Sequence, residues 1–333
     1  MPELRKDPVL GRWIIISKER SKRPTDFIVD EPKVIEGGFC PLCPGNEKTT
    51  PNEVLVFGRE PILPPNSAGW KLRVVPNKFP ALVIEGELEK QAEGLYDRMN
   101  GIGAHEVIIE SPNHEDRFSF LSQEQMLFVL RAFRNRILDL AHDKRFQYVM
   151  VFKNYGRSAG ASLEHPHSQL VALPILPRMV ISELDGALSY YKYKDRCIFC
   201  DIIRQEIQQD VRLVCQNSHF VTLSPFAPRS PFEMWIMPKD HSSSYTEQSE
   251  ESLAALVDIF SESLQRLDAC IPNVPYNFVL HTQPLRSQPL DHFHWHFEIV
   301  PKLTSIAGFE WGSGFYINPM PPEDTCTYLK EAM

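Results

Sequence analysis

A long internal repeat is the feature that most constrains how this chain can fold. Residues 40–174 and 197–301 can be laid against each other so that the same motifs occur in the same order. In both copies a C-x-x-C pair precedes two apolar stretches that end in prolines, then an amphipathic stretch, another apolar stretch and a histidine cluster. His114 precedes Tyr148 by 34 residues, and His241 precedes Tyr276 by 35. We therefore expect two copies of one supersecondary unit rather than two unrelated halves.

Each copy is expected to contain several strands and one long helix. The predicted strands lie at 72–80, 106–114 and 148–152 in the first copy, and at 219–228, 233–241 and 276–280 in the second. Apolar residues at helical spacing predict helices over 122–142 and 249–269. The histidine clusters 165–169 and 292–296 are predicted to lie on strands, and 85–103 is an extra stretch in the first copy. These elements predict an α+β fold with two tandem domains (1–190 and 191–333), mostly antiparallel sheets and helices packed on one face.

Charge and composition argue against two classes of binding partner, nucleic acids and membranes. Lys+Arg 35 against Asp+Glu 43 gives a net charge of −8, which argues against nucleic-acid binding. The chain has no run of about 18 apolar residues that could span a bilayer. Its first residues lack an apolar signal core, so we expect a cytoplasmic protein without a membrane or nucleic-acid partner. Seven cysteines in such a chain favour metal binding over a disulfide framework.

The two C-x-x-C pairs predict two metal sites, because two thiolates at this spacing can grip one tetrahedral ion. With two imidazoles each pair would form a closed, structural Zn²⁺ site, two per chain. The first set is Cys40, Cys43, His114 and His165; the second is Cys197, Cys200, His241 and either His292 or His294. Counting favours His292, because it follows His241 by 51 residues, the interval that separates His114 from His165.

The histidine cluster of the first copy predicts a reactive site. If 165–169 is a strand, its period of two puts His165, His167 and Gln169 on one face. With His165 on the metal, His167 would lie about 7 Å further along with its ring free to act as a nucleophile. Phosphorus is the electrophile that suits it, and Gln169 could donate a hydrogen bond to a phosphate oxygen. The small-residue loop 154–162 could hold phosphates with its backbone N–H groups.

The motif His165-Pro166-His167-Ser168-Gln169, together with Cys40-x-x-Cys43, resembles the galactose-1-phosphate uridylyltransferase branch of the histidine-triad superfamily. The resemblance runs from residue 7 to residue 314 and implies two tandem histidine-triad-like halves and a homodimer. It also implies a ping-pong reaction in which UMP passes from UDP-glucose to His167 and then to galactose 1-phosphate. An ADP-glucose phosphorylase-like adenylyltransferase shares these motifs, including residues 23–27. A nucleotide hydrolase, which Gln169 disfavours, and a non-enzymatic zinc-stabilised binding module are two competing hypotheses.

The same resemblance implies roles for further residues. His167 would be the nucleophile, Gln169 would orient the phosphate, and His294 rather than His292 would complete the second metal site. The implied substrate contacts are Arg20, Arg23, Asn77, Phe79, Asn154, Gly160 and Ser162, with Phe309, Gly312 and Asn318 in a hexose-binding tail that reaches the partner subunit. Other members of the family hold a second ion, which can be iron, with a glutamate and histidines, and Glu183, His281 and His296 match that donor set. His105, His142 and His219 match no motif and are expected to be ordinary surface or packing residues.

Overall fold

The computed structural model describes residues 1–17, 27 and 38–333 of the chain. Its strands are β1 (Glu3–Lys6), β2 (Trp13–Ile16), β3 (Leu55–Phe57), β4 (Leu72–Pro76), β5 (Gln91–Glu93), β6 (Tyr96–Arg98), β7 (Ala104–Ile109), β8 (Tyr148–Tyr155), β9 (His167–Leu173), β10 (Leu213–Gln216), β11 (Phe220–Leu223), β12 (Met234–Pro238), β13 (Tyr276–His281), β14 (His296–Pro301) and β15 (Tyr316–Asn318). Its α-helices are α1 (Gln123–Leu140), α2 (Arg178–Lys194), α3 (Ile198–Gln209), α4 (Glu250–Cys270), α5 (Gly308–Ser313) and α6 (Pro322–Glu331).

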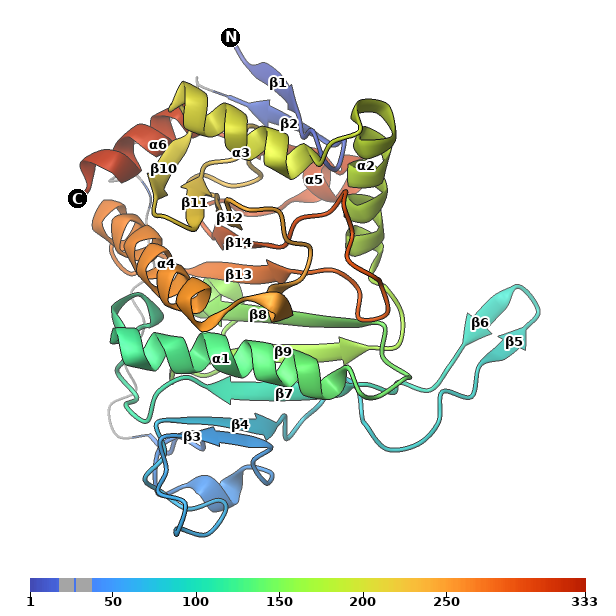
Figure 1. The fold of residues 1–333 in the computed structure, drawn as a ribbon, viewed down its shortest axis with the longest axis vertical. Coiled ribbons are helices and arrows are strands. Elements are labelled where there is room, and N and C mark those ends of the chain that lie inside the picture. Colours follow the sequence, from blue (N-terminus) through green and yellow to red (C-terminus); the bar gives the residue numbers. More distant parts are fainter. Residues whose placement is uncertain (18–26, 28–37) are drawn as a thin grey trace.

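One antiparallel sheet of ten strands joins the two copies of the repeat (Figure 1). Its order is β10-β11-β12-β14-β13-β8-β9-β7-β4-β3, so the second copy occupies one half and the first copy the other. The corresponding strands β8 and β13 meet in the middle, where Asn154 pairs with Asn277. Outward from the middle of the sheet, the strands of the second copy (β13, β14, β12, β11, β10) follow the same order as the corresponding strands of the first copy (β8, β9, β7, β4, β3). This arrangement confirms the predicted α+β class and the two tandem halves.

The two long predicted helices lie side by side on one face of this sheet (Figure 1). Ser122 caps α1 by accepting a hydrogen bond from the backbone N–H of Gln125, and Ser249 caps α4 in the same way. The buried core beneath them includes Phe133 of α1 and Phe260 of α4, whose rings lie 6.2 and 5.4 Å from that of Phe278 on β13. Burial of these apolar faces stabilises the helices against the sheet.

The expectation that helices cover only one face is wrong for the second half. A separate apolar cluster joins Ile198 and Phe199 of α3 and Ala187 of α2 to Trp235 and Met237 on the opposite face of β12. β12 reads Met-Trp-Ile-Met-Pro and all five residues are buried, as expected for a strand covered on both sides. The internal repeat gives no signal for α2 and α3, because α2 lies between the two copies and α3 begins within the second C-x-x-C pair, whereas no α-helix begins at the first pair.

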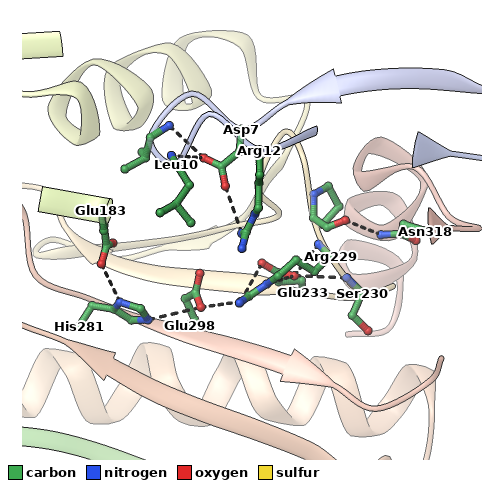
Figure 2. Close-up of polar contacts among 12 residues, drawn as sticks. Asp7, Leu10, Arg12, Glu183, Arg229, Ser230, Glu233, His281, Glu298 and Asn318 are labelled. Carbon is green, nitrogen blue, oxygen red and sulfur yellow. Dashed lines mark hydrogen bonds and ion pairs between the residues drawn. The ribbon is translucent and has the colours of Figure 1, made fainter. Parts of the chain in front are cut away.

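Two smaller sheets complete the fold. β1 and β2 form a hairpin, and β15 joins it in parallel with β2. The turn of this hairpin is closed by Asp7, which accepts a hydrogen bond from the backbone N–H of Leu10 at 3.0 Å and pairs with Arg12 at 3.1 Å (Figure 2). The extra stretch of the first copy contains the hairpin β5–β6, which projects from the body in Figure 1. None of the helices in the described part of the chain is long and apolar enough to cross a lipid bilayer.

Candidate active site and metal centres

The first cysteine–histidine set comes together as the spacing predicts. Cys40 and Cys43 lie in a turn that packs against residues of β3, β4 and β7, and His114 and His165 lie in the segments next to β7 and β9. One ligand atom from each of the four residues lies within 4.8 Å of the others. Cys43 Sγ is 3.4 Å from His114 Nδ1 and 3.5 Å from His165 Nδ1. This donor set fits a tetrahedral Zn²⁺ ion.

The surroundings of this group also suit a metal ion. His165 is fully buried, and its Nε2 lies 2.8 Å from the backbone oxygen of Ser111, which turns Nδ1 toward the thiols. Burial lowers the pKa of His165 to about 4, so its ring is neutral at pH 7 and can act as a ligand. Burial raises the pKa of Cys43 to about 11, so metal binding must release this thiol proton.

The second set repeats this arrangement with His294 as its fourth member. Cys200 Sγ is 3.4 Å from His241 Nδ1 and 3.7 Å from His294 Nδ1. The Nε2 atoms of both histidines face backbone oxygens, at 3.1 Å from Leu290 and 2.9 Å from Pro238. His292, by contrast, presents its backbone oxygen to this group. That oxygen lies 3.7 Å from Cys197 Sγ. The count that favours His292 fails because the second copy has one extra residue between His241 and Tyr276 and one more between Tyr276 and His294.

Glu183, His281 and His296 also lie together, with ligand atoms within 4.8 Å of one another. His281 sits between two carboxylates (Figure 2): its Nδ1 is 2.9 Å from Glu183 and its Nε2 is 3.4 Å from Glu298. Burial alone would lower the pKa of His281, but the two carboxylates raise it to about 10. Arg229 pairs with Glu298 at 2.5 Å. Arg229 also pairs with the buried Glu233 at 3.5 Å, so its charge is shared between two carboxylates.

His167, the nucleophile predicted from sequence, is the first residue of strand β9. β9 begins at His167, so the expectation that His165 lies on the same strand is wrong; Pro166, which has no N–H, separates the two. In the second copy β14 likewise begins only at His296. His167 has 6% of its surface exposed, and its Nδ1 lies 2.8 Å from the backbone oxygen of His165. Its ring is therefore held at one nitrogen rather than free.

This contact defines which nitrogen of His167 can react. A backbone oxygen only accepts, so Nδ1 must carry the hydrogen and Nε2 keeps the lone pair. Burial, assisted by the nearby charge of Lys153, lowers the pKa of His167 to about 4. At pH 7 the ring is neutral, and Nε2 is an unprotonated nucleophile.

A buried ion pair supports this strand from the opposite face of the sheet. Lys153 Nζ on β8 donates to Glu110 Oε2 at 2.6 Å and to the backbone oxygen of His167 at 2.9 Å. Ser168 Oγ donates to the other carboxylate oxygen of Glu110. Lys153 and Glu110 are 2% and 0% exposed. If one of the two charges is removed, water therefore cannot reach the other to stabilise it.

We expect Lys153→Met to lower the free energy of unfolding by about 3–5 kcal/mol, because it leaves the Glu110 carboxylate buried without a cation. The matched control is Lys71→Met. Lys71 pairs with Glu124 at 2.7 Å, but the two side chains are 46% and 64% exposed, so we expect a loss below about 1 kcal/mol. Urea unfolding of both variants measures the difference. Equal losses would show that the Lys153–Glu110 pair does not support the strand.

Gln169 and the residues around it form the polar face beside His167. Gln169 lies two residues after His167 on the same face of β9. Its Oε1 is 2.9 Å from Nε2 of His105, a residue for which no functional contact was expected. Asn77, whose Nδ2 is 3.2 Å from the same His105 nitrogen, also lies here, and Phe79 beside it is 84% exposed. The structure therefore adds His105 to the group that sequence motifs define.

The small-residue loop follows β8 and borders a cavity of about 430 Å³. Gly160 adopts a φ of +90°, a conformation that favours glycine, and Ser162 is exposed. Asn154 and Ala159 line the cavity together with Asn277, and the segment before β15 closes its far side. His167 and Gln169 are not among the residues that line it. Phe152, which also lines the cavity, is opposite Gln169 in the register between β8 and β9.

The remaining predicted contacts differ in placement. Phe309 and Gly312 lie on the exposed short helix α5, with Phe309 49% exposed. Asn318 on β15 is fully buried: its amide donates to the backbone oxygen of Pro228 and accepts from the N–H of Met320. Because both ends of this amide are already bonded, the function proposed below does not use it. Arg20 and Arg23 lie outside the described residues.

These features define a class of enzyme. Two tandem halves share one antiparallel sheet, and a neutral buried histidine with a reactive Nε2 stands beside an amide and a small-residue loop. A neutral imidazole in such a setting has the chemistry of a nucleophile, so the fold and the site together fit a group-transfer enzyme of the α+β class.

The chain belongs to the galactose-1-phosphate uridyl transferase family, because sequence models of the N-terminal and C-terminal domains of that family match residues 1–177 and 183–320. It is 39% identical to an ADP-glucose phosphorylase of Arabidopsis thaliana over 99% of this chain and 93% of that protein. It is 27% identical to a galactose-1-phosphate uridylyltransferase of Thermotoga maritima over 99% and 98% of the two chains. A crystal structure of an A. thaliana ADP-glucose phosphorylase with bound ADP-glucose superposes with a TM-score of 0.84, at 37% identity and 99% coverage of both chains.

Proposed function

We propose that this protein is a nucleotidyltransferase that cleaves ADP-glucose with phosphate, through a nucleotidyl intermediate on His167. The geometry that supports transfer is the imidazole of His167, whose Nδ1 is tied to the His165 backbone oxygen at 2.8 Å and whose Nε2 is left as the nucleophile. The observation that favours ADP-glucose is the relationship to an ADP-glucose phosphorylase at 39% identity, against 27% for a uridylyltransferase.

The proposed first step needs no proton transfer at His167. The Nε2 lone pair forms a bond to the α-phosphorus, and the bond from that phosphorus to the bridging oxygen breaks, so glucose 1-phosphate leaves with the electron pair. The His165 backbone oxygen accepts the Nδ1 hydrogen bond and stabilises the positive charge that develops on the ring. The amide of Gln169 can donate to a non-bridging oxygen of the transferred phosphoryl group.

The second step returns the enzyme to its starting state. An oxygen of inorganic phosphate bonds to the α-phosphorus, the N–P bond breaks, and its electron pair returns to Nε2 as ADP leaves. In this proposal Asn154, Gly160 and Ser162 on the small-residue loop contact phosphate groups, and Asn77 and Phe79 contact the nucleotide. In this proposal Zn²⁺ ions in the two cysteine–histidine groups would be structural and take no part in the steps; the first group would hold the segment next to His167 through His165.

The main competing function is the uridylyltransferase reaction, with UDP-glucose as donor and galactose 1-phosphate as acceptor. It is supported by the family to which the chain belongs and uses the same residues in the same roles. We also propose a homodimer in which the exposed Phe309 and Gly312 of α5 contact the sugar bound by the partner subunit. Analytical ultracentrifugation tests this assembly.

A donor competition distinguishes the two reactions. We expect the protein to convert ADP-glucose and phosphate into ADP and glucose 1-phosphate, with a kcat/KM at least about 10-fold above that for UDP-glucose with galactose 1-phosphate. His167→Gly is the blank for both donors. A preference for UDP-glucose and galactose 1-phosphate would replace our proposal with the uridylyltransferase reaction.

A further inference from the structure

His105 makes a set of contacts that no sequence motif predicts. It lies on β7, next to β9, where Val107 is opposite Gln169 and His105 is opposite Val171. His105 is therefore the diagonal neighbour of Gln169 on the same face of the sheet. Its Nε2 is 2.9 Å from Gln169 Oε1, and its Nδ1 is 3.1 Å from the backbone nitrogen of Ala81.

The contact with Ala81 determines the tautomer of His105. A backbone N–H can only donate, so Nδ1 of His105 must accept and carries no hydrogen. The neutral ring then has its hydrogen on Nε2. Because Nε2–H is a donor, its partner on Gln169 must be the carbonyl oxygen, as the structure has it. This chain of donors and acceptors leaves no freedom to reverse the Gln169 amide.

The same histidine lies against a second amide. Asn77 Oδ1 accepts from the backbone N–H of Phe79 at 2.9 Å, which fixes the orientation of the Asn77 side chain. Its Nδ2 is 3.2 Å from His105 Nε2 but cannot donate to a nitrogen that already carries a hydrogen. Among the described residues, no acceptor is hydrogen-bonded to Gln169 Nε2, and Asn77 Nδ2 has no acceptor besides this unsuitable nitrogen. Both NH₂ groups are thus available to a ligand.

We propose that His105 is a positioning residue, which orients the Gln169 amide so that its nitrogen, not its oxygen, is offered to the transferred phosphoryl group. A reversed amide would point a partial negative charge at the phosphate oxygens and oppose transfer. The identity of the transferred group rests on the function proposed above, but the orientation of the amide does not depend on it.

The test is a double-mutant cycle between His105 and Gln169. We expect His105→Phe, which keeps a ring but has no donor, to lower the rate of nucleotidyl transfer to the protein from ADP-glucose by about 10-fold, with little change in donor affinity. We expect no further loss when His105→Phe is added to Gln169→Ala, because no amide remains to be oriented. His105→Gln, which returns an N–H near the position of Nε2, should restore most of the rate. The control is His219→Phe, a histidine of the second half whose side chain is 32% exposed and makes no contact with Gln169.

Two outcomes would overturn the proposal: additive losses in the cycle, or a His105→Phe protein as fast as the parent. A separate measurement needs no substrate. In protein labelled with ¹⁵N-histidine, the ring signals that disappear in His105→Gln should show Nε2 protonated and Nδ1 unprotonated, and the opposite tautomer would contradict the proposed orientation. If no donor labels the parent protein while the tautomer is as expected, the proposed function fails and the orientation of Gln169 stands.

Discussion

Replacing His167 by Gly is expected to abolish nucleotidyl transfer while leaving the fold and the metal content of the chain intact. The variant loses the only atom that we propose to bond to phosphorus, so we expect turnover to fall on the order of 10⁴–10⁶-fold. The ring is 6% exposed and holds one hydrogen bond, to the His165 backbone oxygen, so its loss removes little from the metal group. Steady-state kinetics and metal analysis of the same preparation measure both effects.

The neighbouring His165 provides the contrast. Although only two residues away, it points its Nδ1 at Cys43, 3.5 Å from the thiol, and we expect His165→Gly to release metal. The cavity left by His167→Gly has the size of an imidazole, so a nucleotidyl-imidazolide should restore turnover in that variant alone. Equal metal loss from the two variants would contradict the division of roles between these histidines.

The second large effect is expected from Cys40→Ser. If the first cysteine–histidine group holds a structural Zn²⁺ ion, loss of one thiolate weakens binding, and the free energy of metal binding contributes directly to folding. We expect the free energy of unfolding to fall on the order of 4 kcal/mol and the metal content to drop from about two ions per chain to about one.

Cys215→Ser is the matched control, because Cys40 and Cys215 are both 9% exposed and only Cys40 belongs to a metal group. It should keep both ions and most of the stability. A Cys40→Ser protein that melts like the parent but has lost activity would show that the ion serves catalysis rather than structure. Chelator-treated parent protein that contains no metal and keeps its fold would remove the metal sites altogether.

The fold can be predicted from sequence as far as the repeat reaches. Matching motifs predict α1, α4 and most strands of the large sheet, because each copy carries the same periodic apolar pattern. The joining of both copies into one sheet through β8 and β13 cannot be predicted, because a register such as Asn154 opposite Asn277 has no local signal. Helices α2 and α3 also escape prediction, because nothing in the other copy corresponds to them.

The candidate site shows the same limit. Spacing correctly predicts that Cys40, Cys43, His114 and His165 form one group, because cysteines and histidines at this spacing are typical of a metal site. Spacing fails for His292, because the second copy has one extra residue on each side of Tyr276, which shifts the count by two. His105 cannot be found in this way, because its role depends on which residue of β9 lies diagonally across from it. Only the register between β7 and β9 indicates it.

The most direct test of the central claim is the intact mass of the protein after incubation with donor alone, followed by peptide mapping. We predict that ADP-glucose adds one adenylyl group per chain at His167, with release of one equivalent of glucose 1-phosphate before any phosphate is present. Because a histidine N–P bond is labile in acid and stable in base, the added mass should persist in alkali and disappear on acidification. An unmodified His167 in protein that nonetheless turns over ADP-glucose and phosphate would mean direct transfer between substrates, and would contradict the account.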